Sequence, residues 1–414
     1  MDRRAFFAAA AAGLGALPLL SSKVQAATRS ARLKITAIEI WRMTGDPEQQ
    51  KAYQVKEGLG TRRDHRPMPL SQLYMRILTN EKGVEGFYGT FEQTSANAAM
   101  NVAQSLIGMD PLATESISER LRGSQTHSGY HMFGVSTIDN CLWDLKGRLL
   151  DLPVYRLLGG SRNVIDCYAS LVSTPVKDLG LVKTRATQIK EDGYTSQKWF
   201  PQLGPADGDA GFEQNVALIR TLRETLGEYY TFMIDVLSAR WNIPYAIRWC
   251  KAVEQYHPYW LEEVLPTPPG QIEGYARLRE ETSILIAAGE HNYGRWEVND
   301  LIKANAVDVI QVDPEWGGGI TELLKICALA STYGLIVSPH NQRTIALAHL
   351  IASQPFNLCP ILEYQVNIQP NLAYFEKNPL VPKNSKIEIP DLPGFGIELD
   401  EARIVKRERI YPTA

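Results

Sequence analysis

The sequence predicts an α/β protein in which a parallel (β/α)8 barrel follows an N-terminal region of strands and helices. Short apolar runs of strand length recur eight times after residue 160, and stretches able to form helices separate most of them. Alternating buried strands and helices favour a parallel sheet, and eight such strands are typical of a barrel. An open doubly wound sheet is the alternative. It usually begins with a glycine-rich turn, and none follows the first strand here.

Composition is that of a globular protein: 414 residues, 44% hydrophobic and 21% charged, with 31 glycines and 24 prolines. The formal net charge of −3 offers no basic field for nucleic acid or for an anionic membrane. The five cysteines lie far apart and form no C-x-x-C pair, which excludes a zinc ribbon and a disulfide framework.

Residues 1–26 have the pattern of an export signal. Arg3 and Arg4 precede two phenylalanines and an apolar, alanine-rich stretch over 8–20, and small residues end the segment at Ala26. The paired arginines indicate a twin-arginine signal, and therefore a periplasmic mature protein. A membrane anchor is the alternative, but about 13 apolar residues are too few to cross a bilayer. No later stretch is long enough for a transmembrane helix, so we expect no membrane span in the mature protein.

The region before residue 160 predicts strands and then helices. Residues 33–42 and 73–78 are strand-like, a charged loop covers 60–67, and 95–158 is helical in pattern. A break at Leu158-Gly159-Gly160 marks a domain boundary. We therefore expect a first domain over 30–158, a barrel over 161–375 and a C-terminal segment over 376–414 that returns to the first domain.

Eight apolar runs form the predicted barrel. Stretches such as 213–226, 244–255 and 320–333 have helical character between them, and the tail over 386–411 is too polar for another barrel unit. The expected strands are 164–171, 196–200, 230–236, 259–264, 284–290, 307–313, 335–340 and 358–364.

Three successive strands end in a carboxylate. Asp235, Glu262 and Glu290 are separated by 27 and 28 residues, about one βα unit each. Parallel strands bring such residues to one rim of the barrel, where active sites lie. Three anions in a sheltered site repel one another, and oxygen ligands favour Mg²⁺ or Mn²⁺ over zinc or copper. A solvated cap or an ion pair is the alternative for any single one of them.

The next strands end in a different pair of side chains. Asp313 and His340 are again 27 residues apart, so a carboxylate can lie beside an imidazole and make it a general base. A structural histidine is the alternative. Glu363 follows on the last strand.

With these residues in this order, the chain resembles the enolase superfamily in its mandelate racemase and muconate-lactonising branch. The segments Ser136–Gly147 and Leu152–Gly160 support the resemblance. It implies a modified barrel with an α+β capping domain built from both termini, and a homo-oligomer. It also implies Mg²⁺ held by Asp235, Glu262 and Glu290, and an Asp313–His340 base.

Within that branch the chain is most similar to sugar-acid dehydratases of the L-rhamnonate type. The matching segments are Gly204–Gly211, Gly289–His291, Gly317–Leu323 and Pro393–Leu399. The triple glycine could form a phosphate cradle, but a tight turn at the start of the 320–333 helix is the favoured interpretation.

The family's common step is removal of the proton α to a carboxylate, and the charge that develops needs an electrostatic sink such as Mg²⁺. Family racemases use a second base, the second lysine of a K-x-K pair. Here Lys198 is followed by Trp199 and Phe200, so the second lysine is absent. We therefore expect chemistry on one face: His340 takes the C2 proton and then protonates the departing C3 hydroxyl.

Other polar residues have supporting roles in this hypothesis. Lys198 neutralises the substrate carboxylate or enediolate, or forms a salt bridge at the rim. Glu363 hydrogen-bonds the enediolate, or pairs with a neighbouring base. His291 contacts a substrate hydroxyl. A loop containing Arg62, Arg63, His65 and Arg66 reaches the sugar acid, or is merely solvated. The remaining histidines are interpreted as structural: His127, His131, His257 and His349.

The sequence thus predicts a periplasmic, Mg²⁺-dependent dehydratase that converts a small-molecule sugar (aldonic) acid to a 2-keto-3-deoxy acid. An epimerase or cycloisomerase of the same superfamily is the nearest alternative. A catalytically silent sugar-acid binding protein is the alternative from another class, and the intact His340–Asp313 pair argues against it.

Overall fold

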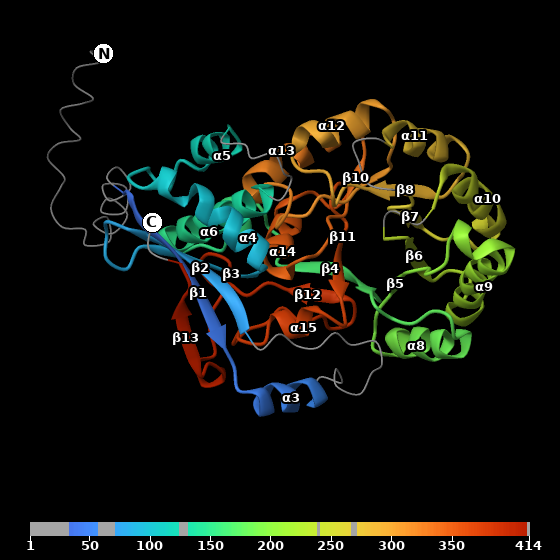
Figure 1. Ribbon diagram of the computed structural model, residues 1–414, viewed down its shortest axis with the longest axis horizontal. Coiled ribbons are helices and arrows are strands. Elements are labelled where there is room, and N and C mark those ends of the chain that lie inside the picture. The colour runs from blue at the N-terminus through green and yellow to red at the C-terminus, as the bar shows by residue number, and fades with distance from the viewer. Residues whose placement is uncertain (1–32, 57–70, 124–130, 238–240, 266–270, 412–414) are drawn as a thin grey trace, which may run out of the picture.

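The computed structural model describes residues 33–56, 71–123, 131–237, 241–265 and 271–411. It confirms the predicted fold class, a modified (β/α)8-type barrel with an α+β cap (Figure 1). Among the described residues, no helix has both the length and the apolar character that a membrane span requires. All five cysteines are buried and unpaired.

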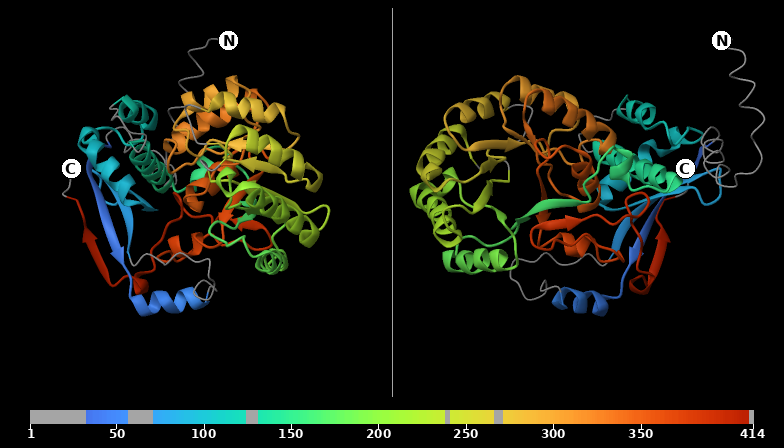
Figure 2. Two further views of the ribbon diagram at one scale, coloured as in Figure 1. Left: turned by 45° about the vertical axis from the view of Figure 1, so that its right-hand side comes forward. Right: turned by 180° about the vertical axis from the view of Figure 1, so that it is seen from behind.

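The cap contains one antiparallel sheet and most of the helices before residue 158. Its sheet order is β13-β1-β2-β3, so the last strand of the chain lies beside the first (Figure 2). The cap strands are β1 (Ile35–Thr44), β2 (Ser71–Thr79), β3 (Glu85–Phe91) and β13 (Lys406–Arg409). The cap helices are α3 (Pro47–Lys56), α4 (Gln93–Ala103), α5 (Thr114–Gly123), α6 (His131–Leu150) and α7 (Val154–Leu157).

The barrel contains the eight predicted parallel strands in the order β10-β9-β8-β7-β6-β5-β4-β11. The row curls until its ends meet, since the Val337 N–H donates to Leu358 O at 2.8 Å just before β11. The strands are β4 (Val164–Ser170), β5 (Ser196–Trp199), β6 (Thr231–Asp235), β7 (Trp260–Glu262), β8 (Leu285–Ala288), β9 (Val309–Ile310), β10 (Ile336–Val337) and β11 (Ile361–Gln365). A further strand, β12 (Lys386–Glu388), joins β4 antiparallel and was not foreseen.

Helices surround the barrel strands on the outside (Figure 1). They are α8 (Leu179–Glu191), α9 (Gly208–Leu226), α10 (Ile243–Val253), α11 (Ile272–Glu280), α12 (Arg295–Lys303), α13 (Gly319–Thr332) and α14 (Thr344–Ser353). The short helix α15 (Gln369–Leu372) lies between the barrel and the cap sheet (Figure 1). Inside, a buried cluster that includes Tyr168, Met233 and Trp260 fills one layer of the barrel. Because side chains alternate along a strand, residues two positions further on, such as Ser170 and Glu262, point into the same interior.

The cap helix α6 lies against the barrel helix α13, and the triple glycine makes this close approach possible. Gly318 and Gly319 have φ of 115° and 76°, and a Cβ on Gly319 would lie 2.5 Å from the Asp139 carboxylate. Side chains of α6 accept the N–H groups at the start of α13: Ser136 from Gly318, Asn140 from Ile320 and Asp139 from Thr321. The predicted tight turn is confirmed, and its N–H groups are already bonded.

Candidate active site

Polar side chains lie at or just beyond the carboxyl ends of seven consecutive barrel strands, from β5 to β11. Each is at most 8% exposed. Parallel pairing places Asp235 opposite Glu262, and Glu262 opposite Ala287, three residues before Glu290. The structure thus gathers at one end of the barrel all the predicted residues on these strands: Lys198, Asp235, Glu262, Glu290, Asp313, His340 and Glu363.

The Lys198 ammonium lies among three of these carboxylates. Its Nζ is 2.5 Å from Glu262 Oε1, 3.0 Å from Glu363 Oε1 and 3.1 Å from Asp235 Oδ2. Burial alone would lower the pKa of Lys198, but attraction to Glu262 and Glu363 outweighs this and raises the pKa well above its usual value. Lys198 is therefore a permanent positive charge at the centre of the site.

The carboxylates outnumber this one ammonium. Burial, together with repulsion from Glu290, raises the pKa of Asp235 to about 6. Burial, together with repulsion from Glu263 and Glu262, raises the pKa of Glu290 to about 8. Five buried carboxylates share the region, so it has an excess of negative charge and an all-oxygen donor set that fit a hard divalent cation: Asp235, Glu262, Glu263, Glu290 and Glu363.

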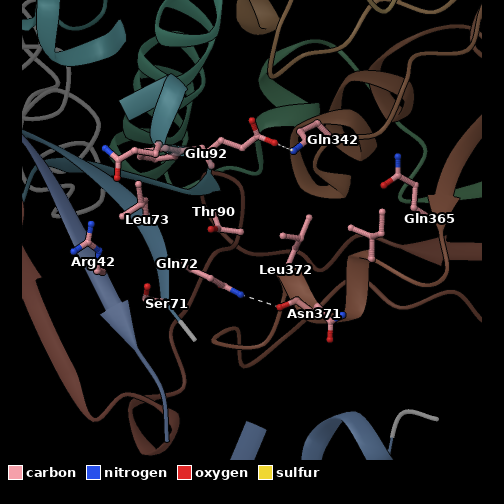
Figure 3. A pocket seen from close by; sticks show the side chains of 13 residues that line it. Arg42, Ser71, Gln72, Leu73, Thr90, Glu92, Gln342, Gln365, Asn371 and Leu372 are labelled. Carbon is pink, nitrogen blue, oxygen red and sulfur yellow. Dashed lines mark hydrogen bonds between the residues drawn. The ribbon is translucent and has the colours of Figure 1, made fainter. Parts of the chain in front are cut away.

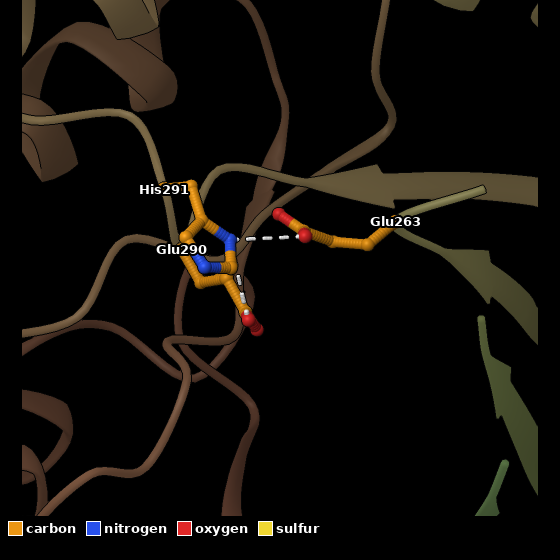
Figure 4. A group of neighbouring side chains, drawn as sticks. All are labelled: Glu263, Glu290 and His291. Carbon is orange, nitrogen blue, oxygen red and sulfur yellow. Dashed lines mark hydrogen bonds and ion pairs between the residues drawn. The ribbon is translucent and has the colours of Figure 1, made fainter. Parts of the chain in front are cut away.

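A second histidine–carboxylate pair lies beside the predicted trio. Glu263 Oε2 is 3.0 Å from His291 Nδ1, and Glu290 Oε1 is 3.4 Å from the same nitrogen (Figure 4). Among the described residues, these three form the group whose ligand atoms all come within 4.8 Å of one another. Asp235, Glu262 and Glu290 occupy adjacent strand ends but do not form such a group, because the carboxylates of Asp235 and Glu262 turn toward the Lys198 ammonium.

His340 and Asp313 form the expected pair. His340 Nδ1 is 2.6 Å from Asp313 Oδ2, which assigns the Nδ1 proton to this bond and leaves Nε2 for chemistry. Nε2 lies 3.3 Å from the Gln365 amide and 3.9 Å from Glu290 Oε2. Burial opposes the charged imidazole, but Glu290 and Asp313 outweigh it and raise the pKa of His340 to about 10. The Trp316 ring stacks on the imidazole at a centroid distance of 4.7 Å.

A cavity of about 550 Å³ lies between the cap strands β2 and β3 and the barrel residues Gln342, Gln365 and Asn371 (Figure 3). Gln365 lines this cavity, and its side-chain amide also contacts His340 Nε2. Side-chain amides line much of its surface; the Gln342 amide donates to Glu92 Oε1 at 2.9 Å and the Gln72 amide donates to Asn371 O at 2.8 Å. A polar cavity of this kind suits a ligand with several hydroxyl groups. The predicted contacts His65 and Arg66 lie outside the described residues.

Sequence reasoning missed three residues of the site. Gln365 could have been found, since it stands two positions after Glu363 on one strand and so faces the same interior. Glu263 follows the strand end with a φ of 44°, and Trp316 lies in the turn after β9. Their side-chain directions depend on loop geometry, which strand periodicity does not predict.

The modified barrel, its α+β cap and the polar side chains at the strand ends together define a class of barrel proteins, and comparison with known families agrees. Residues 181–403 match the family described as "Enolase C-terminal domain-like", and residues 71–159 match "Mandelate racemase / muconate lactonizing enzyme, N-terminal domain". The chain therefore belongs to the enolase superfamily, in its mandelate racemase/muconate lactonizing enzyme branch.

Similar proteins include dehydratases. An L-rhamnonate dehydratase of Saccharopolyspora erythraea is 33% identical over 278 residues, covering 66% of this chain and 67% of that protein. The structure of a rhamnonate dehydratase from Gibberella zeae complexed with Mg has a TM-score of 0.74 and 26% identity, covering 89% of this chain and 95% of that one. An enolase superfamily member from Salmonella Typhimurium has a TM-score of 0.77 and 25% identity, covering 92% and 99%.

Proposed function

We propose that the protein is a Mg²⁺-dependent hydro-lyase that converts a sugar (aldonic) acid to its 2-keto-3-deoxy acid. The observation that carries the proposal is the His340–Asp313 pair, which contacts two residues that line the cavity, Gln365 and Gln342. Similarity to L-rhamnonate dehydratase supports dehydration over other reactions of the superfamily.

In this proposal Asp235, Glu262 and Glu290 hold the Mg²⁺. The excess of buried carboxylates over Lys198 supports this assignment, as does the Mg in the rhamnonate dehydratase structure. Bound there, Mg²⁺ supplies positive charge to the enediolate that forms when the C2 proton leaves. The charge of Glu290 is the largest cause that raises the pKa of His340. A cation held there would offset that charge, and would thereby lower the pKa of His340 and favour the neutral imidazole that accepts a proton.

His340 acts twice in the proposed reaction. Its Nε2 takes the C2 proton and the electrons of the C–H bond enter the enediolate. The same imidazolium then protonates the C3 hydroxyl, the C3–O bond breaks and water leaves. The resulting enol becomes the 2-keto acid. Asp313 holds the imidazole by its Nδ1–H and offsets the charge that it gains.

Lys198 and Glu363 complete the polar surface in this proposal. The Lys198 ammonium offsets the carboxylate charge of the substrate. Burial would raise the pKa of Glu363, but the Lys198 charge outweighs it and lowers the pKa, so Glu363 is an anion that pairs with Lys198 at 3.0 Å. Glu363 Oε2 accepts the Asn341 N–H at 3.2 Å, so the backbone next to His340 fixes its position. We assign substrate hydroxyls to His291 and to the loop residues His65 and Arg66.

Epimerisation is the second candidate, and one observation favours it. The imidazole of His291 pairs with Glu263 and its side chain is 35% exposed, so a second histidine–carboxylate pair is accessible near the first. Phe200, in place of a second lysine after Lys198, argues against it. In deuterium oxide, epimerisation would put deuterium at C2 without loss of water, whereas dehydration would give a keto acid that reacts with semicarbazide.

A panel of aldonic and aldaric acids, assayed for keto-acid formation with Mg²⁺, tests the proposal. We expect His340→Asn to abolish turnover of the acid that the wild type converts, while Mg²⁺ still raises the melting temperature of the variant. His257→Asn is the matched control, because His257 is exposed and precedes the amino end of β7, whereas Glu262 stands at its carboxyl end. Turnover that survives His340→Asn would exclude His340 as the base.

We also propose that residues 1–26, which lie outside the described part of the chain, direct export to the periplasm. Replacing Arg3 and Arg4 by lysine should leave the protein in the cytoplasm with its signal uncleaved. Undiminished export of the double variant would contradict the proposal without affecting the assigned chemistry.

A further inference from the structure

A buried polar cluster joins the cap to both barrel segments that contain the His340–Asp313 pair. We call this cluster the clamp; it consists of Tyr88, Asn140, Glu315 and Arg343. Each of the four is at most 3% exposed, so water competes little for their hydrogen bonds.

Glu315, two residues after Asp313, is the centre of the clamp. Its backbone N–H donates to Asp313 Oδ1 at 2.5 Å. Its side-chain Oε1 accepts a short hydrogen bond from the Tyr88 hydroxyl on cap strand β3, and the Asn140 amide on cap helix α6 lies 3.4 Å from the same oxygen. Glu315 therefore contacts the cap through its side chain and Asp313 through its backbone N–H.

The remaining two residues of the clamp hold the neighbouring backbone. Asn140 also donates to Pro314 O at 3.1 Å. Arg343, three residues after His340, donates to Gly89 O at 2.9 Å and forms a short ion pair with Glu376. Adjacent cap residues, Tyr88 and Gly89, thus hold the Asp313 segment and the His340 segment respectively.

The orientation of the Asp313 carboxylate depends on this backbone. Its Oδ2 bonds His340 Nδ1 at 2.6 Å and the Gln342 N–H at 2.8 Å, and its Oδ1 bonds only the Glu315 N–H among the contacts described. A displacement of Glu315 would weaken its hydrogen bond to Oδ1, and the carboxylate would then rotate away from the imidazole. Groups that orient a catalytic pair in this way are worth roughly 10- to 100-fold in activity.

We propose that Tyr88 and Glu315 are positioning residues, which transmit the docking of the cap to the orientation of Asp313 and through it to His340. The proposal rests on the proposed function only in treating His340 as the base. Burial and the charge of Asp313 raise the pKa of Glu315 to about 8, and the hydrogen bond from Tyr88 opposes this rise. The phenol therefore also favours the anionic form of Glu315.

Tyr88→Phe removes a single oxygen and tests the proposal. The measurement that needs no substrate is the proton NMR signal of the imidazole N–H in the His340–Asp313 bond, recorded on protein with ¹⁵N-labelled histidine. The chain has seven histidines, and the signal is assigned by its absence from His340→Asn. We expect Tyr88→Phe to shift it upfield as the bond lengthens, and to lower kcat roughly tenfold with KM little changed.

Tyr245→Phe is the matched control. Tyr245 is also buried, and its hydroxyl accepts from the Asn215 amide at 3.1 Å between the outer barrel helices α9 and α10. We expect this variant to lose a similar amount of stability while leaving the histidine signal and kcat unchanged. If Tyr88→Phe behaves as Tyr245→Phe does, the clamp is only structural and the proposal is overturned.

Glu315→Gln provides an independent variant should Tyr88→Phe not fold. It keeps the side-chain shape and replaces one carboxyl oxygen by an NH₂ group, and we expect the same upfield shift; an unshifted signal would overturn the proposal. A protein that dehydrates no acid of the panel but shows the shift in both variants would contradict the proposed function alone. An unshifted signal in an active dehydratase would contradict the positioning role alone.

Discussion

In the proposed reaction, Asp313 both orients His340 and offsets its charge, and its two carboxylate oxygens have different partners. Oδ2 meets the imidazole and the Gln342 N–H, whereas Oδ1 meets the Glu315 N–H. A carboxylate both fixes the imidazole tautomer and stabilises the imidazolium that forms after proton abstraction. An amide of the same shape can do neither as well.

We therefore expect Asp313→Asn to lower kcat on the order of 10³- to 10⁴-fold, the loss seen when a catalytic histidine loses its orienting carboxylate. Steady-state kinetics with the acid identified from the panel, and the shift of melting temperature on adding Mg²⁺, provide the measurements. Asp178→Asn is the control: Asp178 caps exposed helix α8, and asparagine caps equally well. A rate within a few-fold of wild type would show that His340 works without this partner.

At the scale of the elements, the start of α13 depends on glycine for two reasons that can be separated. Gly319 has a φ of 76° and a Cβ there would lie 2.5 Å from Asp139. Gly334 has a similar φ of 68°, but a Cβ there would meet nothing within 4 Å. Alanine at position 334 therefore destabilises the fold only through backbone strain, whereas alanine at position 319 also clashes with α6.

Gly334→Ala should lower the free energy of unfolding by about 1 kcal/mol, the strain of a left-handed residue with a Cβ. Gly319→Ala should cost about 2 kcal/mol more, because overpacking adds to the strain. Urea unfolding of both variants at the same pH measures the difference. An equal decrease in unfolding free energy in the two variants would show that α6 and α13 can move apart without a measurable loss of stability.

The barrel strands could be predicted from sequence because most of them are short apolar runs that are largely buried on both faces. Strand β3 could not, because its run Glu85–Phe91 contains two glycines. The cap explains them: a Cβ on Gly86 would lie 2.3 Å from Cys141 O, and one on Gly89 would lie 2.6 Å from the Tyr74 ring. These positions require glycine because other elements pack closely against them. Strand propensity, which depends only on the local sequence, does not predict such contacts.

The same division holds for the site. Residues at the ends of parallel strands could be predicted, because the fold alone brings them to one rim; Lys198 and His340 are examples. The clamp could not, since Tyr88 and Glu315 are 227 residues apart and meet only when cap and barrel dock. No periodic pattern in the sequence indicates that these two residues are in contact.

For the whole molecule, a buried histidine makes stability depend on pH. His349 on α14 is fully buried, its Nδ1 accepts the Tyr155 N–H at 3.1 Å, and burial lowers its pKa to about 3. Its ordinary pKa in an unfolded chain is about 6.5. Between pH 3 and pH 6.5 the unfolded state therefore binds a proton at His349 that the folded state does not bind. The stability is fully present above pH 6.5 and is lost as pH falls toward 3.

We expect this group to remove up to about 1.4 kcal/mol of unfolding free energy for each pH unit below 6.5. His349→Gln should flatten that slope, although it lowers stability at pH 7. Urea unfolding from pH 7 to pH 4 measures it, with His257→Gln as the exposed control. A slope unchanged in His349→Gln would assign acid sensitivity to other groups.

The pairing of β13 with β1 has a consequence for how the chain reaches its native state. Residues near 41 and 409 are direct neighbours, so the first sheet is finished only after the whole barrel between them has been synthesised. Until then β1 presents an open edge that another nascent chain could add to. Contacts of such separation form slowly, which makes the newly made protein a natural client for chaperones that shield strand edges.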